Sequence, residues 1–325
     1  MSKTIRTDVA VIGAGTAGLF ALHHAMKAGA RALAFDPGPL GTTCARVGCM
    51  PSKLLIAAAE AAHSAENAGV FGVRAGVKVD GARVMKRVRL WRDRFVGGMM
   101  EEYDELVKKK LLIKEKARFT GPHTLEAGGR TYEFRTAVIA TGSVTIVPPP
   151  YRKHSRFLLT REEIFEQRRL PASLLVVGGG LIGLELGQAL SRLGVRVTLL
   201  GLDRLVGPLQ DPGLRAEAAG IFSEEFDFHP HHELLELKPA GKTIKVSFRD
   251  ARGKKREASF EKILIAAGQR PDFDGLGLEN TGIPLDDKGR PAADPLTMRV
   301  GGSHFFLAGD ADPFRPSLHE AGFEG

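Results

Sequence analysis

Apolar runs of strand length alternate with amphipathic stretches of helical spacing along most of the chain. The order apolar strand, helix, apolar strand is found twice, at residues 8–35 and again at residues 174–200. Within these two copies, the apolar runs cover residues 8–12, 32–35, 174–177 and 195–200. Strands that alternate with helices in this way predict parallel sheets covered by helices, because a parallel connection needs a crossover. The pattern therefore predicts an α/β fold with an internal repeat.

The rest of the pattern predicts where the chain is helical and where it returns to a sheet. Residues 53–65 and 84–110 carry apolar side chains at helical spacing. Residues 111–140 alternate between apolar and polar positions, which is typical of an antiparallel meander. Two further apolar runs, at residues 137–140 and 263–267, predict strands that complete the two halves of the architecture.

A glycine-rich loop follows the first strand in each copy of the repeat. The glycines are Gly13, Gly15 and Gly18 in the first loop and Gly178, Gly180 and Gly183 in the second. In a loop of this spacing, the first glycine permits a tight turn, the second lets a pyrophosphate approach the backbone, and the third lets helix and strand pack closely. The N-terminus of the following helix offers free N–H groups and a positive dipole to the phosphates. Two such loops predict two Rossmann-like dinucleotide-binding domains, the second inserted into the first.

The two copies differ at the tip of their second strand. Asp36 ends that strand in the first copy, where a carboxylate accepts hydrogen bonds from a ribose 2′-OH. Gly201 stands at the matching place in the second copy, with Asp203 and Arg204 just beyond it. An unmodified ribose normally requires an acid there, whereas a 2′-phosphate requires arginines. The sequence therefore leaves the choice between NAD and NADP open for the second site.

The only two cysteines of the chain, Cys44 and Cys49, lie five residues apart. A secreted disulfide scaffold would contain more cysteines, and a structural zinc site would need four ligands. Pro51 and the alanine-rich stretch after it predict that Cys49 lies at or near a helix start, where the helix dipole favours the thiolate. A second thiol so close can form a disulfide with it and release it again. The pair therefore predicts redox chemistry rather than two buried structural cysteines.

Composition excludes several other classes of protein. The 325 residues are 43% hydrophobic and 26% charged, which is ordinary for globular domains, and no apolar run has the length of a membrane span. The net charge of +8 is spread along the chain, and its densest runs, residues 108–110 and 252–256, contain no aromatic residues for base stacking. The histidines at 229, 231 and 232 favour a solvated loop over a metal site. We therefore expect that the protein binds no nucleic acid, membrane or metal. We expect it to be located in the cytoplasm.

The segment from Cys44 to Lys53, of the form C-x4-C-x-P-S-K, resembles the active-site signature of the pyridine nucleotide–disulfide oxidoreductases. Within this family it is most similar to dihydrolipoamide dehydrogenase. Residues 13–18 are similar to the FAD pyrophosphate loop of the family, residues 178–185 to its nicotinamide-nucleotide loop, and residues 297–310 to its second FAD motif. Residues 42–46 differ from the usual signature. These differences leave the identity of the substrate open, but they do not affect the prediction of a redox disulfide.

The resemblance implies a role for individual residues. Cys49 would exchange electrons with the flavin and Cys44 would attack the substrate disulfide, while Lys53 and Glu185 would pair beside the flavin. The residues that would bind the cofactors, FAD and NAD or NADP, are Gly13, Gly15, Gly18, Asp36, Thr43, Thr141, Gly142, Gly178, Gly180, Gly183, Gly268, Gly309 and Asp310. Asp310 in particular would hold the ribityl chain. We expect a FAD-dependent dithiol–disulfide oxidoreductase that acts on a small lipoamide-like substrate.

The resemblance also predicts the division of the chain. FAD would bind residues 1–148 and 271–325, and the nicotinamide nucleotide residues 149–270. Family members continue beyond this point into a C-terminal dimerisation domain that supplies a His–Glu acid–base pair, so a homodimer is expected only with that domain. A helix over residues 316–325 is expected to place His319 near the flavin. The alternatives are a flavoprotein reductase of another acceptor, such as a metal ion or quinone, and a cofactor-binding fragment without disulfide turnover.

Overall fold

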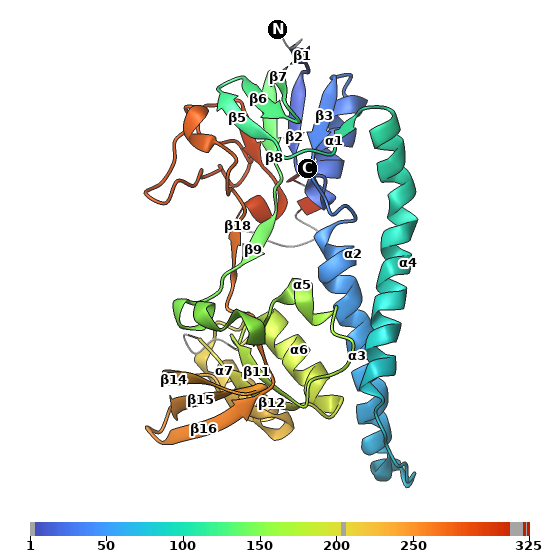
Figure 1. Cartoon of the computed structure of the whole chain (residues 1–325), viewed down its shortest axis with the longest axis vertical. Coiled ribbons are helices and arrows are strands. Elements are labelled where there is room, and N and C mark those ends of the chain that lie inside the picture. The colour runs from blue at the N-terminus through green and yellow to red at the C-terminus, as the bar shows by residue number, and fades with distance from the viewer. Residues whose placement is uncertain (1–3, 203–205, 313–320, 323) are drawn as a thin grey trace. The chain divides into compact units, whose positions relative to one another are not determined.

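Parallel sheets of the predicted kind are present in the computed structural model, which describes residues 4–202, 206–312, 321–322 and 324–325. The chain divides into a first unit, Met1–Cys44, Phe95–Val144 and Arg270–Gly325, and a second unit, Ala45–Arg94 and Thr145–Gln269 (Figure 1). The sequence predicts boundaries between the FAD segments and the nicotinamide-nucleotide segment after residues 148 and 270. They lie close to the boundaries between the two units, after residues 144 and 269.

Residues 45–94 belong to the second unit, although the predicted division places them with the FAD segment. The reason is packing: α3 (Cys49–Glu66) contributes Leu55 and Ala59 to the same buried cluster as α6 (Leu181–Arg192). Which cofactor each segment binds stays a prediction.

The first unit is built on a five-stranded parallel sheet with the strand order β19-β8-β2-β3-β4. Its strands are β2 (Val9–Ile12), β3 (Ala32–Phe35), β4 (Leu112–Ile113), β8 (Thr136–Ile139) and β19 (Phe305–Leu307). From the central strand β2, the chain moves to one side for β3 and β4 and to the other side for β8 and β19. The carboxyl ends of β2 and β8 therefore form a topological switch point, where open α/β sheets bind ligands.

The predicted meander over residues 111–140 is correct only in its middle. There β5 (Arg118–Gly121), β6 (Thr124–Ala127) and β7 (Arg130–Glu133) are antiparallel neighbours, and β1 (Ile5–Arg6) pairs with β7 in parallel. The two ends of the range, β4 and β8, instead belong to the parallel sheet. Side chains alternate between two faces in both kinds of sheet, so the pattern could not separate them.

Both faces of this parallel sheet are covered. Val11 points toward one face and packs with residues of α1 (Thr16–Lys27) and of the C-terminal part of α4 (Gly81–Lys108). Its neighbour Ile12 points to the opposite face and packs with residues of β5, β6 and β7. The first unit therefore has three layers, with the parallel sheet in the middle.

The second unit repeats this design on a parallel sheet of order β10-β17-β11-β12-β13. Its strands are β10 (Leu158–Leu159), β11 (Ser173–Val177), β12 (Arg196–Leu200), β13 (Asp227–His229) and β17 (Lys262–Ile265). The switch point lies here between β11 and β17. It corresponds to the one between β2 and β8 in the first unit.

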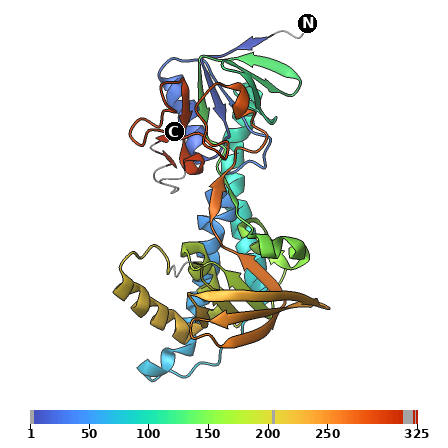
Figure 2. The same ribbon diagram turned by 90° about the vertical axis from the view of Figure 1, so that its left-hand side faces the viewer.

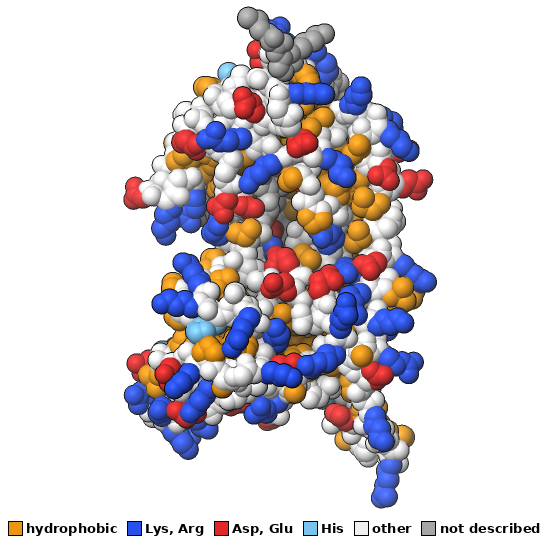
Figure 3. All heavy atoms as spheres, in the orientation of Figure 1, with side chains coloured by type: hydrophobic (Ala, Val, Ile, Leu, Met, Phe, Trp, Pro, Cys, Tyr) orange, Lys and Arg blue, Asp and Glu red, His pale blue; other side chains and the backbone are white. Residues whose placement is uncertain are grey.

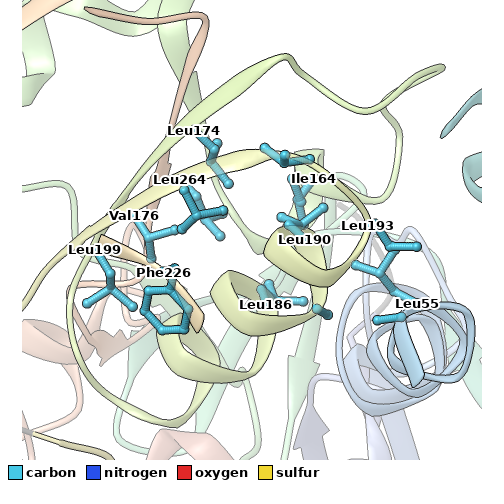
Figure 4. Packing of buried hydrophobic residues seen from close by; sticks show 14 of the residues in the cluster. Leu55, Ile164, Leu174, Val176, Leu186, Leu190, Leu193, Leu199, Phe226 and Leu264 are labelled. Carbon is cyan, nitrogen blue, oxygen red and sulfur yellow. The ribbon is translucent and has the colours of Figure 1, made fainter. Parts of the chain in front are cut away.

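Successive residues of β11 show the two covered faces of the second sheet. Leu174 and Val176 pack with Leu186 and Leu190 of α6 in the cluster drawn in Figure 4. Leu175 packs on the other face, against an antiparallel sheet. That sheet consists of β14 (His232–Ala240), β15 (Thr243–Asp250) and β16 (Lys255–Phe260) and is seen with α7 (Pro212–Glu225) in Figure 2. Burying an aliphatic side chain of this kind contributes about 1.5–3 kcal/mol.

Short elements connect these layers. They are α2 (Thr43–Val47), η1 (Ala68–Phe71), β9 (Ser143–Thr145), η2 (Pro149–Phe157), α5 (Arg161–Ile164), β18 (Gln269–Pro271), η3 (Leu278–Asn280) and η4 (Gly309–Ala311). Strands β9 and β18 pair with each other. Within the described ranges, no helix is long and apolar enough to span a membrane. On the face drawn in Figure 3, basic side chains are interspersed with acidic ones rather than gathered in one patch.

Candidate functional site

The first glycine loop connects β2 to α1 at the switch point of the first sheet. Gly13 has a φ of +104°, and a Cβ on it would lie 2.3 Å from the carbonyl oxygen of Ala140, just after β8. A Cβ on Gly18 would lie 2.0 Å from the carbonyl oxygen of Gly13. Both contacts involve backbone atoms, which cannot move aside, so these two positions admit only glycine.

Gly15 differs from its two neighbours in the loop. It is the N-cap residue of α1, and a Cβ placed on it would meet no atom within 4 Å. Open space therefore lies in front of a helix N-terminus, where backbone N–H groups and the helix dipole favour an anion. This is the place at which the sequence predicts a pyrophosphate.

The second loop has the same geometry between β11 and α6. A Cβ on Gly178, whose φ is +116°, would lie 2.2 Å from the carbonyl oxygen of Ala266, and one on Gly183 would lie 2.0 Å from that of Gly178. Gly180 is the N-cap of α6 and, like Gly15, has open space in front of it. The structure therefore contains two loops of equivalent geometry, one in each unit, each followed by a helix N-terminus.

Asp36 lies against the first loop. Its Oδ2 accepts a hydrogen bond of 2.7 Å from the backbone N–H of Ala14, and its Oδ1 accepts one of 2.7 Å from that of Gly38. A carboxylate oxygen can accept more than one hydrogen bond, so both oxygens retain capacity for ribose hydroxyls. The geometry fits the predicted role of this residue.

Gly201 has a steric reason to be glycine. A Cβ there would lie 2.8 Å from both Cα and the carbonyl oxygen of Pro230, which follows β13. No side chain can be placed at the tip of β12 unless that backbone moves. The neighbouring Asp203 and Arg204, which the sequence offers as alternatives, lie outside the described residues.

The far side of the first switch point holds the other predicted FAD contacts. Thr141 has a buried side-chain oxygen, Oγ1, that has no hydrogen-bond partner in the described part of the chain. The carboxylate of Asp310 accepts a hydrogen bond of 2.9 Å from Ser143 Oγ, and the N–H of Gly309 donates one of 2.7 Å to Glu324 Oε2. A buried hydroxyl without a partner normally costs about 1–3 kcal/mol, and a bound polar ligand removes that cost. These residues fit a large polar cofactor such as FAD.

Gly142 and Gly268 occupy matching places after β8 and β17. Both have positive φ, of +72° and +104°. Gly142 follows β8, whose end faces Gly13, and Gly268 follows β17, whose end faces Gly178. Both predicted residues therefore lie at the carboxyl edge of their sheet.

The predicted redox segment forms two consecutive helices. Thr43 begins the short helix α2, which contains the partly buried Cys44. Cys49 is the first residue of α3 and is exposed, and Ser52 Oγ donates a hydrogen bond of 3.1 Å to its carbonyl oxygen. The sequence predicts a helix start at or near Cys49, and α3 begins there. The role of the pair in electron transfer stays a prediction.

Lys53 and Glu185 meet in the second unit. Lys53 Nζ donates a hydrogen bond of 3.0 Å to Glu185 Oε1, with the two side chains 68% and 27% exposed. The pair joins the helix that begins with Cys49 to the helix that begins after the second glycine loop. An exposed ion pair adds at most about 1 kcal/mol to stability, so its effect is mainly on the position of these groups.

A pocket of about 400 Å³ opens beside the second loop. Leu181, Leu184 and Glu185 of α6, the residues around Gly207, and Phe222 of α7 line it. The volume lies within the usual range for a small-molecule site, and the lining is apolar apart from Glu185 and Gln188. The pocket places an apolar surface next to the predicted nicotinamide-nucleotide loop.

The histidine cluster is part of the sheet structure. His229 Nε2 lies 2.9 Å from Asp227 Oδ1, and the hydrogen bond from His229 lowers the pKa of Asp227. His232 Nδ1 lies 2.9 Å from the carbonyl oxygen of Gly201, and burial lowers the pKa of His232. Metal-binding groups of three or more histidine, cysteine or acidic residues are absent from the described residues. His319 and most of the predicted helix over 316–325 lie outside those residues.

The structure also reveals site residues that sequence reasoning did not identify. Tyr103 of α4 is fully buried, and its hydroxyl donates a hydrogen bond of 2.8 Å to the carbonyl oxygen of Ala14 in the first loop. Burial raises the pKa of Tyr103 to about 12, so its hydroxyl stays protonated at neutral pH. Ser143 and Glu324 hold the 309–310 segment. None of these residues has a sequence signal, because each reaches the site only through tertiary packing.

Comparison with known proteins agrees with this geometry. A family model described as "Pyridine nucleotide-disulphide oxidoreductase" matches residues 7–325. A dihydrolipoyl dehydrogenase of Halobacterium salinarum is 32% identical over 98% of this chain and 68% of its own length. A second one, of Thermus scotoductus, is 33% identical over 98% of this chain and 69% of its own length.

Two solved structures have the same fold. LpdA from Mycobacterium tuberculosis has a TM-score of 0.81 at 22% identity, over 99% of this chain and 71% of that one. The HOCl-induced flavoprotein disulfide reductase RclA from Escherichia coli has a TM-score of 0.78 at 22% identity, over 98% of this chain and 69% of that one. At this level of identity, the two likenesses establish the fold alone.

Proposed function

This chain belongs to the pyridine nucleotide-disulphide oxidoreductase family, and we propose that it is an FAD-dependent oxidoreductase that passes electrons between a dithiol substrate and NAD(P). Dihydrolipoyl dehydrogenases, which are among its relatives at 30% identity or more, use FAD and NAD(H). The α/β fold and the two dinucleotide loops agree with binding of both cofactors.

The observation that carries the proposal is the 3.0 Å contact between Lys53 Nζ and Glu185 Oε1. It links α3, whose first residue is Cys49, to α6, whose N-terminus forms the second dinucleotide loop. The contact places the helix that begins with Cys49 beside the helix that follows the second dinucleotide loop, which agrees with electron exchange between a dithiol and a nicotinamide. A protein that only binds nucleotides has no need of the thiols.

The proposed reaction is dihydrolipoamide + NAD⁺ → lipoamide + NADH + H⁺. One substrate thiolate attacks Cys44 Sγ of a Cys44–Cys49 disulfide, the S–S bond breaks, and Cys49 leaves as a thiolate. The second substrate thiol then displaces Cys44, which closes the substrate disulfide and leaves two reduced cysteines. When bound, FAD supplies a carrier for the two electrons on their way to NAD⁺.

The residues of the chain bind, orient and carry charge in this scheme. The N–H groups at Gly15 and Gly180 would hold the two pyrophosphates, and Asp36 the FAD ribose. Thr141 and Asp310 would contact the remainder of FAD. Lys53, held by Glu185, would place a positive charge near the redox thiols. The proposed substrate is a lipoamide-like dithiol, and the family and the names of the relatives support this substrate class.

Anaerobic titration tests the proposal. NADH added to the FAD-loaded protein should bleach the flavin absorbance, and lipoamide added next should restore it. With limiting reductant, a long-wavelength band from the Cys49 thiolate beside oxidised flavin should appear. Cys49→Ser should abolish the band, and Cys44→Ser should show it without reductant. Flavin that NADH bleaches and lipoamide does not restore would show that the acceptor is another molecule. No bleaching at all would rule out the proposed function.

A further inference from the structure

Both backbone polar groups of Ala14, in the first dinucleotide loop, are held by hydrogen bonds from side chains or to them. The N–H of Ala14 donates to Asp36 Oδ2 at 2.7 Å, and the carbonyl oxygen of Ala14 accepts from Tyr103 Oη at 2.8 Å. Asp36 is the residue proposed to bind the FAD ribose. Tyr103 lies on a different element, α4, far along the chain.

The direction of the Ala14 carbonyl fixes the direction of the next N–H. A peptide unit is planar and trans, so the C=O of Ala14 and the N–H of Gly15 point in opposite directions. With the carbonyl turned toward Tyr103, the N–H of Gly15 points away from that buried hydroxyl. A Cβ on Gly15 would meet no atom within 4 Å, so open space borders the α-carbon of this residue.

Tyr103 also interacts with the segment that leads to the redox thiol. The backbone amides of Gly41 and Thr42 stabilise its ionised form and so oppose the rise that burial causes in the Tyr103 pKa. Both residues have positive φ, of +110° and +51°, and they precede Cys44 by three and two residues. A phenol can donate one hydrogen bond and accept others, so a single buried oxygen joins the loop to this turn.

The second unit provides an independent comparison. Gly179 occupies the position of Ala14 in the second loop, and its carbonyl oxygen accepts a hydrogen bond of 2.7 Å from the N–H of Gly207. The donor is a backbone amide there and a tyrosine hydroxyl in the first loop. The two donors differ in residue type and in the element that carries them. What the two loops have in common is that the carbonyl oxygen at this position accepts a hydrogen bond.

We propose that Tyr103 is a positioning residue that aims the Gly15 N–H at the pyrophosphate of FAD and fixes the turn before Cys44, so that FAD binding and the position of the thiol are coupled. The inference rests on the proposed function, because it takes FAD to be the ligand of the first loop. Tyr103 itself touches neither substrate nor cofactor.

Tyr103→Phe tests this inference, with Tyr132→Phe as the matched control. Tyr132 is also buried in the first unit, with its ring against Phe35. The dissociation constant of FAD is measured from flavin fluorescence on dilution of the holoprotein. The alkylation rate of Cys44 by iodoacetamide is measured in a Cys49→Ser background, and thermal unfolding is followed for all proteins. Tyr103→Phe should weaken FAD binding about tenfold, the loss expected for one buried hydrogen bond, and change the alkylation rate.

The control should leave both the FAD dissociation constant and the alkylation rate unchanged, even if it lowers the unfolding temperature. The inference is overturned if either quantity is unchanged in Tyr103→Phe, or if Tyr132→Phe changes both to the same extent. A wild-type chain that does not bind FAD would instead overturn the proposed function. The two failures are therefore distinguishable.

Discussion

In each dinucleotide loop, the middle glycine differs from its neighbours in what surrounds its α-carbon. In the first loop, a methyl group on Gly13 or Gly18 would lie only 2.3 or 2.0 Å from a backbone carbonyl oxygen of the protein itself. Gly15 has no such neighbour. Its lack of a side chain therefore matters for a ligand and not for the fold.

This difference leads to a paired prediction for the first loop. Gly15→Ala should fold with a stability close to wild type but bind FAD at least about tenfold more weakly, because the methyl group would lie where the pyrophosphate approaches. Gly13→Ala should fail to fold normally or lose several kcal/mol, because its methyl group would meet the Ala140 carbonyl. Thermal unfolding and flavin content measure both effects. Equal losses of stability in the two variants would contradict this account.

Thr141 gives a second prediction at this scale. Its buried Oγ1 has no partner among the described residues, so Thr141→Val should leave the FAD-free protein as stable as wild type, or more stable by about 1 kcal/mol. If the hydroxyl contacts FAD, the same variant should bind FAD more weakly. Thr131→Val is a suitable control, since Thr131 lies in β7, away from the loop. Unchanged FAD affinity in Thr141→Val would remove Thr141 from the set of cofactor contacts.

At the scale of elements, the ends of β12 and β13 decide what the second site can recognise. The backbone of Pro230 fills the space next to Gly201, so the position that normally carries a ribose-binding acid cannot hold one. The sequence indicates only that the acid is missing. The structure shows that the chain at the end of the neighbouring strand β13 excludes it.

We therefore predict weak discrimination between NADH and NADPH. The rates of flavin reduction by the two nucleotides should differ by less than about a hundredfold, which corresponds to about 1–3 kcal/mol for one missing charged contact. Gly201→Glu should not create a preference for NADH and should lower the unfolding temperature, because Pro230 must move. A wild-type preference for NADH above about a thousandfold would require an acid from another segment.

At the scale of the whole molecule, both units have the same three layers and the same loop geometry at their switch points. Symmetry of this kind cannot show which loop binds which cofactor. The differences around the loops favour an assignment. Asp36 occurs in the first unit, as does the Thr141 hydroxyl that has no hydrogen-bond partner among the residues described, whereas the pocket of about 400 Å³ lies beside the second loop.

Hydrogen exchange tests this assignment across the chain. FAD should slow amide exchange in residues 13–18 and 140–143 of the first unit. NADH, added to the FAD-loaded protein, should further slow exchange in residues 178–183 and 266–268 of the second unit, because a ligand stabilises the region that it contacts. Protection by FAD in the second set rather than the first would reverse the proposed division of the chain.

Local sequence pattern was enough to establish the α/β class, the internal repeat and the two glycine loops. These features depend on interactions between residues close in sequence: a tight turn needs glycine at its own position, and a helix start follows from the residues beside it. The start of α3 at Cys49 and the strands before Gly13 and Gly178 are therefore where the pattern predicts them. The pairing of Lys53 with Glu185 follows from the sequence only through the resemblance to a family.

Which distant segments meet was settled by tertiary packing. Residues 45–94 belong to the second unit because α3 packs with α6, and β4 and β8 belong to the parallel sheet although their alternation fits an antiparallel one. Tyr103 reaches Ala14, and Pro230 excludes a side chain from Gly201, across separations of tens of residues. No local pattern records such contacts, because each depends on how buried faces are matched once the sheets have formed.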